Sequence, residues 1–285
     1  MALTCPVCED TRVRTKLRKQ GVEILQCAAC RLAFWIPGAG FDPSSLYDGD
    51  YFASEHAAHG YDDYAALEPA LRATFRRRLA KLGGATGAKL LDVGAAYGFA
   101  ASEAERAGFR VFAAEISADA ARHAGALVPG RVLRASADHL PFGTACFDVV
   151  TLWDVIEHLP APHAAVSEIA RCLRPGGRLV LTTGDVGSLV AWLSGARWHL
   201  YTLPEHLFFY SRESLRRLLG SHGFRVETIR AEGALYPVGY LVERLRKTLV
   251  GRSRTGSIRF PGAGLVVPVN LFDVITVTAR REAAP

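Results

Sequence analysis

The stretch LLDVGAAYGFAASEAERAG, residues 90–108, decides the fold of this chain. An apolar run that is typical of a buried strand leads into a turn with Gly94 and Gly98, and an alanine-rich helical run follows. Glycine lets the backbone turn tightly and approach a ligand closely, while the first amides of the helix face the ligand's polar end. The pattern predicts a nucleotide-binding turn, with an ordinary strand-to-helix turn as the alternative.

A carboxylate ends the next strand-like run, RVFAAEIS, residues 110–117. Glu115 follows the glycine turn by about 20 residues, where dinucleotide-binding folds place an acid that accepts both ribose hydroxyls. Taken alone, Glu115 could equally be a helix cap or a surface carboxylate. The turn and the acid together favour a ligand that contains a nucleoside.

Beyond these motifs, short β-branched runs alternate with alanine-rich helical runs. The alternation predicts an α/β fold with a doubly wound, Rossmann-like sheet of seven strands covered by helices on both faces. We expect this domain to span residues 83–285. An insertion at about 233–268, with helical spacing in GYLVERLRKTLVGR, separates the last two strands and is too long for a simple hairpin loop. We therefore expect the insertion to serve a substrate or a partner.

Two cysteine pairs precede the α/β domain, Cys5-Pro-Val-Cys8 and Cys27-Ala-Ala-Cys30. Pairs at this spacing can deliver four thiolates to one tetrahedral zinc ion, and a reducing compartment keeps the thiols available. A closed four-sulfur site would be structural, because it has no open coordination position. We expect a zinc ribbon over residues 1–43, with four free or buried cysteines as the alternative.

The segment 44–82 contains YDGDYF and then a basic, alanine- and leucine-rich run with helical spacing. We expect it to be a connecting and capping helical segment. Its aromatic residues Tyr47, Tyr51 and Phe52 would either contact substrate or pack between the ribbon and the α/β domain.

Charge and hydropathy narrow the classes of function. The net charge of +6 is the difference between 34 Lys and Arg and 28 Asp and Glu, and the cations are spread along the chain, with clusters at 12–19, 76–81 and 244–259. Aromatic residues do not interleave these cations as in a single-strand nucleic-acid groove, so we interpret the clusters as solvated faces. The lack of a signal pattern or a long apolar run predicts a cytoplasmic protein. Contact of the amphipathic insertion with a membrane surface is a less favoured alternative to packing on the sheet edge.

Five motifs in order resemble those of class I S-adenosylmethionine-dependent methyltransferases: LLDVGAAYG, AAEIS, ADHLPF, FDVVTLWDVIEHL and LRPGGRLVLTT. They cover about residues 85–185, whereas a nicotinamide dehydrogenase would share only the first two. The resemblance implies S-adenosylmethionine as cofactor. It places Asp92, Gly94 and Gly98 around the methionine moiety and Glu115 at the ribose.

The other donor-site residues that the resemblance implies flank the adenine or wall the pocket; they are Ile116, Ala137, Asp138, Trp153 and Asp154. Two positions depart from the family pattern. Ala96 stands where the family often has glycine, which alanine can replace sterically. Ser136 stands where an acid commonly meets the adenine amino group, and Asp138 can substitute for that acid.

The order of ribbon, YDGDYF and methyltransferase motifs resembles bacterial enzymes that methylate sugars, glycans or secondary metabolites. More distantly, the chain resembles ubiquinone-biosynthesis O-methyltransferases, in which an acid-x-x-Glu-His stretch is implicated in binding a divalent metal. Asp154, Glu157 and His158 match that stretch. A structural role for Glu157 and His158 is the alternative.

Methyl transfer to a hydroxyl requires removal of its proton. We expect His158 or His206 to be the base, with Glu157 orienting His158. The expected reaction is O-methylation of a small molecule or a glycan. The alternative is a nucleic-acid-modifying methyltransferase, or a non-catalytic protein that binds nucleic acid through the ribbon.

Overall fold

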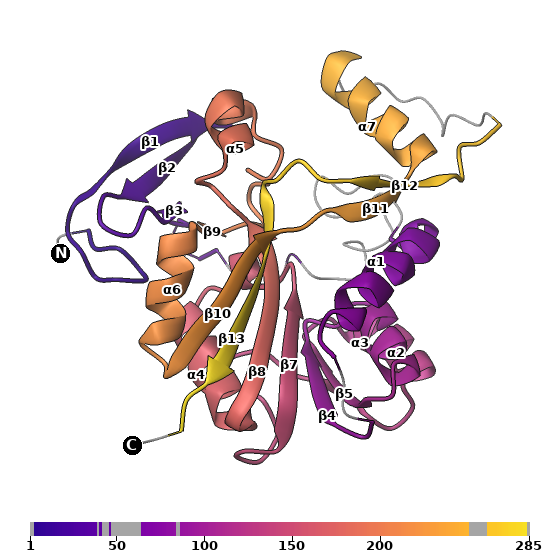
Figure 1. Ribbon diagram of the computed structural model, residues 1–285. Helices are drawn as coiled ribbons and strands as arrows, with labels where there is room; N and C mark the ends of the chain where they lie inside the picture. Colours follow the sequence, from indigo (N-terminus) through magenta and orange to yellow (C-terminus); the bar gives the residue numbers. More distant parts are fainter. Residues whose placement is uncertain are drawn as a thin grey trace.

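A seven-stranded sheet forms the centre of the computed structural model, which describes residues 3–38, 40–41, 46, 64–83, 86–250 and 261–283 (Figure 1). The strand order is β10-β13-β8-β7-β4-β5-β6. Strands β4 to β8 are parallel, and β13 is antiparallel to both of its neighbours, which confirms the predicted fold class. The bounds are β4 Lys89–Val93, β5 Arg110–Glu115, β6 Val132–Arg134, β7 Phe147–Trp153, β8 Leu173–Gly184, β10 Phe224–Ala231 and β13 Val274–Arg281.

Helices cover both faces of this sheet, α4 and α6 on one face and α1, α2 and α3 on the other (Figure 1). Because successive side chains of a strand point to opposite faces, β4 buries Leu91 under the first group and Leu90 under the second. The helix bounds are α1 Glu68–Ala80, α2 Phe99–Arg106, α3 Ala118–Leu127, α4 Pro162–Cys172 and α6 Arg212–Gly220; the 3₁₀ helix η3, Ala65–Leu67, precedes α1.

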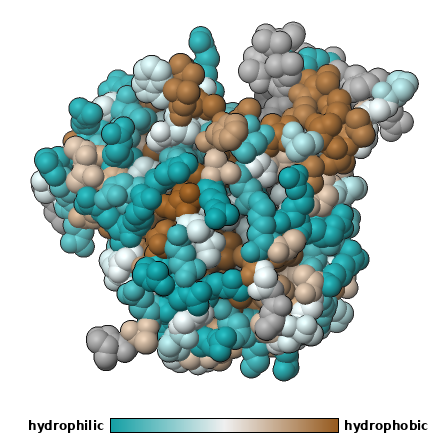
Figure 2. All heavy atoms as spheres, viewed as in Figure 1, coloured by the Kyte–Doolittle hydropathy of each residue, from teal (hydrophilic) through white to brown (hydrophobic). Residues whose placement is uncertain are grey.

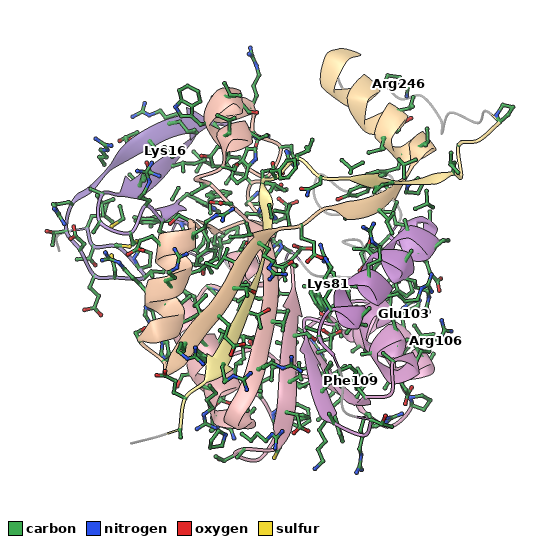
Figure 3. The ribbon with its side chains drawn as sticks, viewed as in Figure 1. Lys16, Lys81, Glu103, Arg106, Phe109 and Arg246 are labelled. Atoms are coloured by element: carbon green, nitrogen blue, oxygen red, sulfur yellow. The ribbon has the colours of Figure 1, made fainter. Side chains whose placement is uncertain are left out.

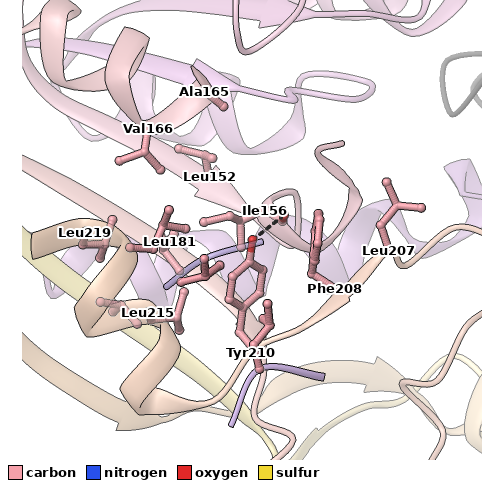
Figure 4. Packing of buried hydrophobic residues seen from close by; sticks show 14 of the residues in the cluster. Leu152, Ile156, Ala165, Val166, Leu181, Leu207, Phe208, Tyr210, Leu215 and Leu219 are labelled. Carbon is pink, nitrogen blue, oxygen red and sulfur yellow. Dashed lines mark hydrogen bonds between the residues drawn. The ribbon is translucent and has the colours of Figure 1, made fainter. Parts of the chain in front are cut away.

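The core beneath α4 and α6 fixes the short 3₁₀ helix η4 (Ile156–His158) at the end of β7 (Figure 4). Ile156 and Leu215 are fully buried, and burial of an aliphatic side chain contributes about 1.5–3 kcal/mol. The hydroxyl of Tyr210 donates a hydrogen bond to the carbonyl oxygen of Ile156 at 3.4 Å. The buried core therefore fixes the backbone of Glu157 and His158, the residues predicted to be catalytic.

The cysteine-rich N-terminus forms a small sheet that the α/β domain completes. Its order is β1-β2-β3-β9, and β9 comes from the chain after α5. Phe34 of β3 pairs with Phe208 of β9, and side chains of both units share one buried core. The bounds are β1 Val13–Lys19, β2 Val22–Cys27, β3 Ala33–Phe34, α5 Leu189–Ser194, the 3₁₀ helix η5 Gly195–Arg197 and β9 Phe208–Phe209.

The insertion between β10 and β13 contains a two-stranded ribbon, β11 (Ala234–Pro237) and β12 (Val266–Val269), besides the expected helix α7 (Val238–Val250). The helix packs on β11 and not on the edge of the large sheet, so the expected place of this helix was wrong (Figure 1). The ribbon itself is fixed to α1, because the amide of Leu235 donates to the Thr74 hydroxyl at 2.9 Å.

Within the described part of the chain, each helix is too short or too polar to cross a bilayer. Tyr47, Tyr51 and Phe52, for which we expected contact with substrate or packing between modules, lie outside the described residues.

Gly98 tests how tightly the glycine turn packs. A methyl group there would lie 2.8 Å from the backbone Cα of Ala124, and the φ angle is +81°, so Gly98→Ala should cost about 2–4 kcal/mol of unfolding free energy. Gly130 is the matched control, because its φ is +70° and nothing lies within 4 Å of an added Cβ. Gly130→Ala should cost only about 1 kcal/mol in urea unfolding. Equal losses would contradict the close approach.

Candidate functional site

The predicted ligand-binding residues lie at the point where the strand order of the sheet reverses. β4 pairs with β5 on one side and with β7 on the other, so the chain leaves β4 in one direction and returns on the opposite side. In doubly wound sheets, ligands bind in the crevice outside the carboxyl ends of the strands at such a switch point. The loops that follow β4, β5 and β7 meet at this edge.

Several residues of the loop after β4 have positive φ angles, in the left-handed region of backbone conformation. Gly94 has a φ of +72°, and a Cβ there would lie 2.5 Å from Cγ2 of Val155 in the loop after β7. Ala96, at the position where glycine was expected, also has a positive φ, +48°. A non-glycine residue adopts this region at a small conformational cost, so the turn is preserved despite the departure in sequence.

Glu115 connects the loops that follow β4 and β5. Its carboxylate accepts hydrogen bonds from the amide of Ala96 at 2.7 Å and from the amide of Ser117 at 2.9 Å. Burial raises the pKa of Glu115 against the opposing effect of these amide donors. A carboxylate has about four acceptor positions, so Glu115 can still accept hydrogen bonds from a ligand. Ile116 follows directly, and its carbonyl accepts from Arg134 at 3.1 Å.

Asp92 is buried beside Glu115. One of its oxygens accepts a hydrogen bond from the Thr151 hydroxyl at 2.7 Å, and the other has no partner among the described residues. Burial raises the pKa of Asp92 to about 7, and the negative charge of Glu115 contributes. A buried acceptor without a donor is unusual and points to a missing hydrogen-bond donor.

The residues expected at the adenine lie in the loop after β6. Ala137 is buried, and Asp138 accepts a hydrogen bond from the hydroxyl of Ser136. Ser136, which stands where the family commonly has an acid, is therefore hydrogen-bonded to Asp138, the residue expected to substitute for that acid.

The end of β7 carries Trp153 and Asp154. Trp153 is buried, whereas Asp154 is exposed and has a φ of +55°. Arg78 of α1 stacks over the Trp153 ring at 5.4 Å, and its guanidinium lies 3.9 Å from the Asp154 carboxylate. Arg78 belongs to the basic cluster that we interpreted as a solvated face; for this residue that interpretation was wrong, because its side chain is only 5% exposed.

Glu157, His158 and His206 form a second cluster, with one potential ligand atom of each within 4.8 Å of the others. Nδ1 of His158 lies 3.0 Å from the Glu205 carbonyl oxygen, and Nδ1 of His206 lies 2.9 Å from the Leu200 carbonyl oxygen. A carbonyl oxygen only accepts, so both Nδ1 atoms carry hydrogen. Each Nε2 of the neutral rings is then the basic atom.

Burial sets the protonation of this cluster. It lowers the pKa of His158 and lowers that of His206 further, where the neighbouring His158 adds to the effect. Burial, followed by the charge of Asp154, raises the pKa of Glu157, and one Glu157 oxygen has no partner among the described residues. The metal pattern that the resemblance implied combined Glu157 and His158 with Asp154. The geometry brings His206 to them, while Asp154 faces Arg78.

The four N-terminal cysteines converge as predicted. Sγ of Cys5 lies 3.5 Å from that of Cys30, and Sγ of Cys8 lies 3.6 Å from that of Cys27. All four sulfurs lie within 4.8 Å of one another, close to the spacing that a tetrahedral site with Zn–S bonds of about 2.3 Å requires. The cluster is thus compatible with zinc.

The cysteine unit also holds the loop that carries His206. The indole N–H of Trp35 donates to the carbonyl oxygen of His206 at 2.9 Å, and the Ser211 hydroxyl donates to the carbonyl oxygen of Cys30 at 2.7 Å. The sequence did not predict these contacts, because no short-range pattern indicates which loop pairs with Phe34.

The sheet, its glycine turn and the acid beside it define a Rossmann-like nucleotide-binding domain. Residues 64–229, more than half of the chain, match the family described as methyltransferase domain. The chain belongs to the methyltransferase-domain family, and the fold of this family supports the use of S-adenosylmethionine.

Among similar proteins, an uncharacterized methyltransferase of Mycobacterium sp. (strain KMS) is 37% identical over 121 residues, which are 39% of this chain and 48% of that protein. The chain therefore spans about half the length of the curated relatives that it matches. The YcgJ protein from Bacillus subtilis has a TM-score of 0.55 at 15% identity and covers 74% of this chain and 99% of its own. The [4+2]-cyclase SpnF has a TM-score of 0.53 at 21% identity, over 82% and 87%. These structures share the fold, which does not by itself define the reaction.

The buried Asp92 makes a specific prediction for the pH dependence of stability. Its pKa is higher in the folded protein than in the unfolded chain, so the unfolded state releases this proton first and the folded state loses stability as the pH rises from about 4 to about 7. Asp92→Asn has no proton to release at this position. The unfolding free energy of the variant relative to the parent should therefore rise by about 2–4 kcal/mol as the pH increases across this range. Urea unfolding at about pH 4.5, near the lower end of this range, and at about pH 8, above it, measures the difference. Asp119→Asn, in α3, is the control, because the Asp119 side chain is 44% exposed and pairs with Arg122; a pH-independent effect of Asp92→Asn would contradict the assignment.

Proposed function

We propose that the chain is an S-adenosylmethionine-dependent methyltransferase that methylates a hydroxyl of a small molecule or a glycan. The observation that carries the donor assignment is the convergence of Asp92, the Gly94 turn and Glu115 at the switch point of the sheet. When bound, S-adenosylmethionine supplies an electrophilic methyl group on its sulfonium sulfur.

The chemistry of this edge fits the donor. The unpartnered oxygen of Asp92 would accept a hydrogen bond from the donor's amino group, and Glu115 would accept the ribose hydroxyls. The residues proposed to flank the adenine and the outer wall are Ile116, Ala137, Asp138, Trp153 and Asp154, with Ala96 and Gly98 completing the turn.

His158 or His206 would remove the acceptor's proton. Burial keeps both imidazoles neutral at ordinary pH, and carbonyl oxygens hold their Nδ1–H groups, so Nε2 is the atom of each ring that would take the proton. Glu157 would orient the cluster. Nucleic acid is the less favoured acceptor, since the buried position of Arg78 removes part of one basic cluster from the surface.

The four cysteines would hold structural zinc. Their sulfurs all lie within 4.8 Å of one another and would supply a complete tetrahedral set, which would leave no coordination position for catalysis.

Glu115→Ala tests the donor site. Loss of the carboxylate should weaken binding of S-adenosylhomocysteine by about 10-fold to 100-fold, because hydrogen bonds to a charged group contribute about 1.5–3 kcal/mol. Isothermal titration calorimetry measures the affinity, and circular dichroism checks the fold. Glu105→Ala is the control, since Glu105 pairs with Arg131 away from the switch point. Unchanged affinity in Glu115→Ala would rule out the proposed donor site.

Cys27→Ser tests the metal centre. The parent protein should contain one zinc ion per chain, and the variant should lose it together with at least about 3 kcal/mol of stability, a fraction of the binding free energy of structural zinc. Metal analysis and thermal unfolding report the two effects. Cys146→Ser, outside the cluster, is the control. A parent protein without zinc, or equal effects in both variants, would contradict the proposal.

A further inference from the structure

A cavity of about 210 Å³ lies between α1 and the β11–β12 ribbon, at the carboxyl end of β10. Among its lining residues, Arg77 and Arg78 lie in the last turn of α1, Lys81 is the C-cap of that helix, and Glu232 follows β10. Figure 3 shows Lys81 at the end of α1 that faces the large sheet. None of these residues belongs to the donor site proposed above.

Arg78 connects the cavity to that donor site. Its side chain is 5% exposed, stacks on Trp153 and lies 3.9 Å from Asp154, yet its Nε has no hydrogen-bond acceptor among the described residues. An unsatisfied N–H on a buried cation is costly. A bound anion beside the guanidinium would offset part of this cost through its charge.

The charge of the cavity is unbalanced. Glu232 is the single acid among its lining residues, and it already accepts hydrogen bonds from Lys81 and from the Thr276 hydroxyl. Although burial opposes the effect, Lys81, Thr276 and the charge of Arg78 lower the pKa of Glu232, so it stays ionised. With the Asp154 carboxylate beside Arg78 also counted, three cations face two carboxylates, which leaves a net positive charge around the cavity.

The opposite wall is apolar and fixed in place. Leu235, Pro268 and Val269 of the β11–β12 ribbon line it, and the Thr74 hydroxyl accepts from the amide of Leu235 at 2.9 Å. The cavity therefore offers cations on one side and an apolar surface on the other.

We propose that this cavity binds the methyl acceptor and that the acceptor carries an oxyanion, a carboxylate or a phosphate, on an apolar body. The inference rests on the proposed function for the acceptor role, since Arg78 places the cavity next to the end of β7. Guanidinium groups match the geometry of both oxyanions. The cations after and within α1 would bind the anion, while the apolar body would pack on the β11–β12 ribbon.

The test measures binding of benzoate, phenyl phosphate and neutral phenol to the full-length protein by NMR titration at low salt, with and without S-adenosylhomocysteine. We expect at least one anion to bind and phenol to bind about tenfold more weakly. The relative affinities of benzoate and phenyl phosphate distinguish a carboxylate acceptor from a phosphorylated one.

Substitutions of Arg77, Lys81 and Glu232 locate the site without changing the buried Arg78. Arg77→Gln and Lys81→Gln should each weaken the anion about fivefold to tenfold, while Glu232→Gln should tighten it severalfold by removing the opposing charge. Arg76→Gln is the matched control on the same helix, because Arg76 pairs with Glu103 outside the cavity. Affinity for S-adenosylhomocysteine should stay unchanged in all four variants.

Each result separates the two proposals. If S-adenosylhomocysteine binds but the anions do not, or if Lys81→Gln and Glu232→Gln have no opposite effects, the anion cavity is wrong and the donor site stands. If the anions bind at this cavity but S-adenosylhomocysteine does not bind, the acceptor role is overturned together with the proposed function.

Discussion

The pairing of β4 with β5 on one side and β7 on the other is the constraint on which the rest of the structure depends. It brings the loops after three strands to one edge, and they can meet only because Gly94 has no side chain to displace Val155. Glu115 then bonds the amides of two of these loops. A crevice with a fixed carboxylate follows from backbone pairing and one close approach.

The proposed acceptor side of the site is built from elements outside the parallel sheet. The cysteine unit holds the His206 loop through Trp35, and the insertion faces α1 across the basic cavity. The parallel sheet and its loops supply the proposed donor site, whereas the cysteine unit and the insertion supply the residues around the proposed acceptor. This division is consistent with the general observation that proteins of one fold carry out many reactions and that the residues of the site determine which one.

The parallel strands and the donor-site residues could be predicted because their signals are local: apolar runs, a glycine turn and an acid at a strand end. The strand β9 could not, because two residues, Phe208 and Phe209, have no periodicity and their partner lies far along the chain. The same holds for the β11–β12 ribbon. Arg78 lies in a basic run that is typical of a solvated helix face, and only the tertiary position of Trp153 explains its burial.

Transfer of a methyl group is the central claim, and the most direct measurement follows that group. The full-length protein is incubated with methyl-labelled S-adenosylmethionine and fractionated cell extract, and the label is then located. The proposed function predicts label in small-molecule or glycan fractions, retained in anionic material if the cavity beside α1 selects the acceptor. Label in nuclease-sensitive material, or no labelled product although the donor is bound, would contradict it.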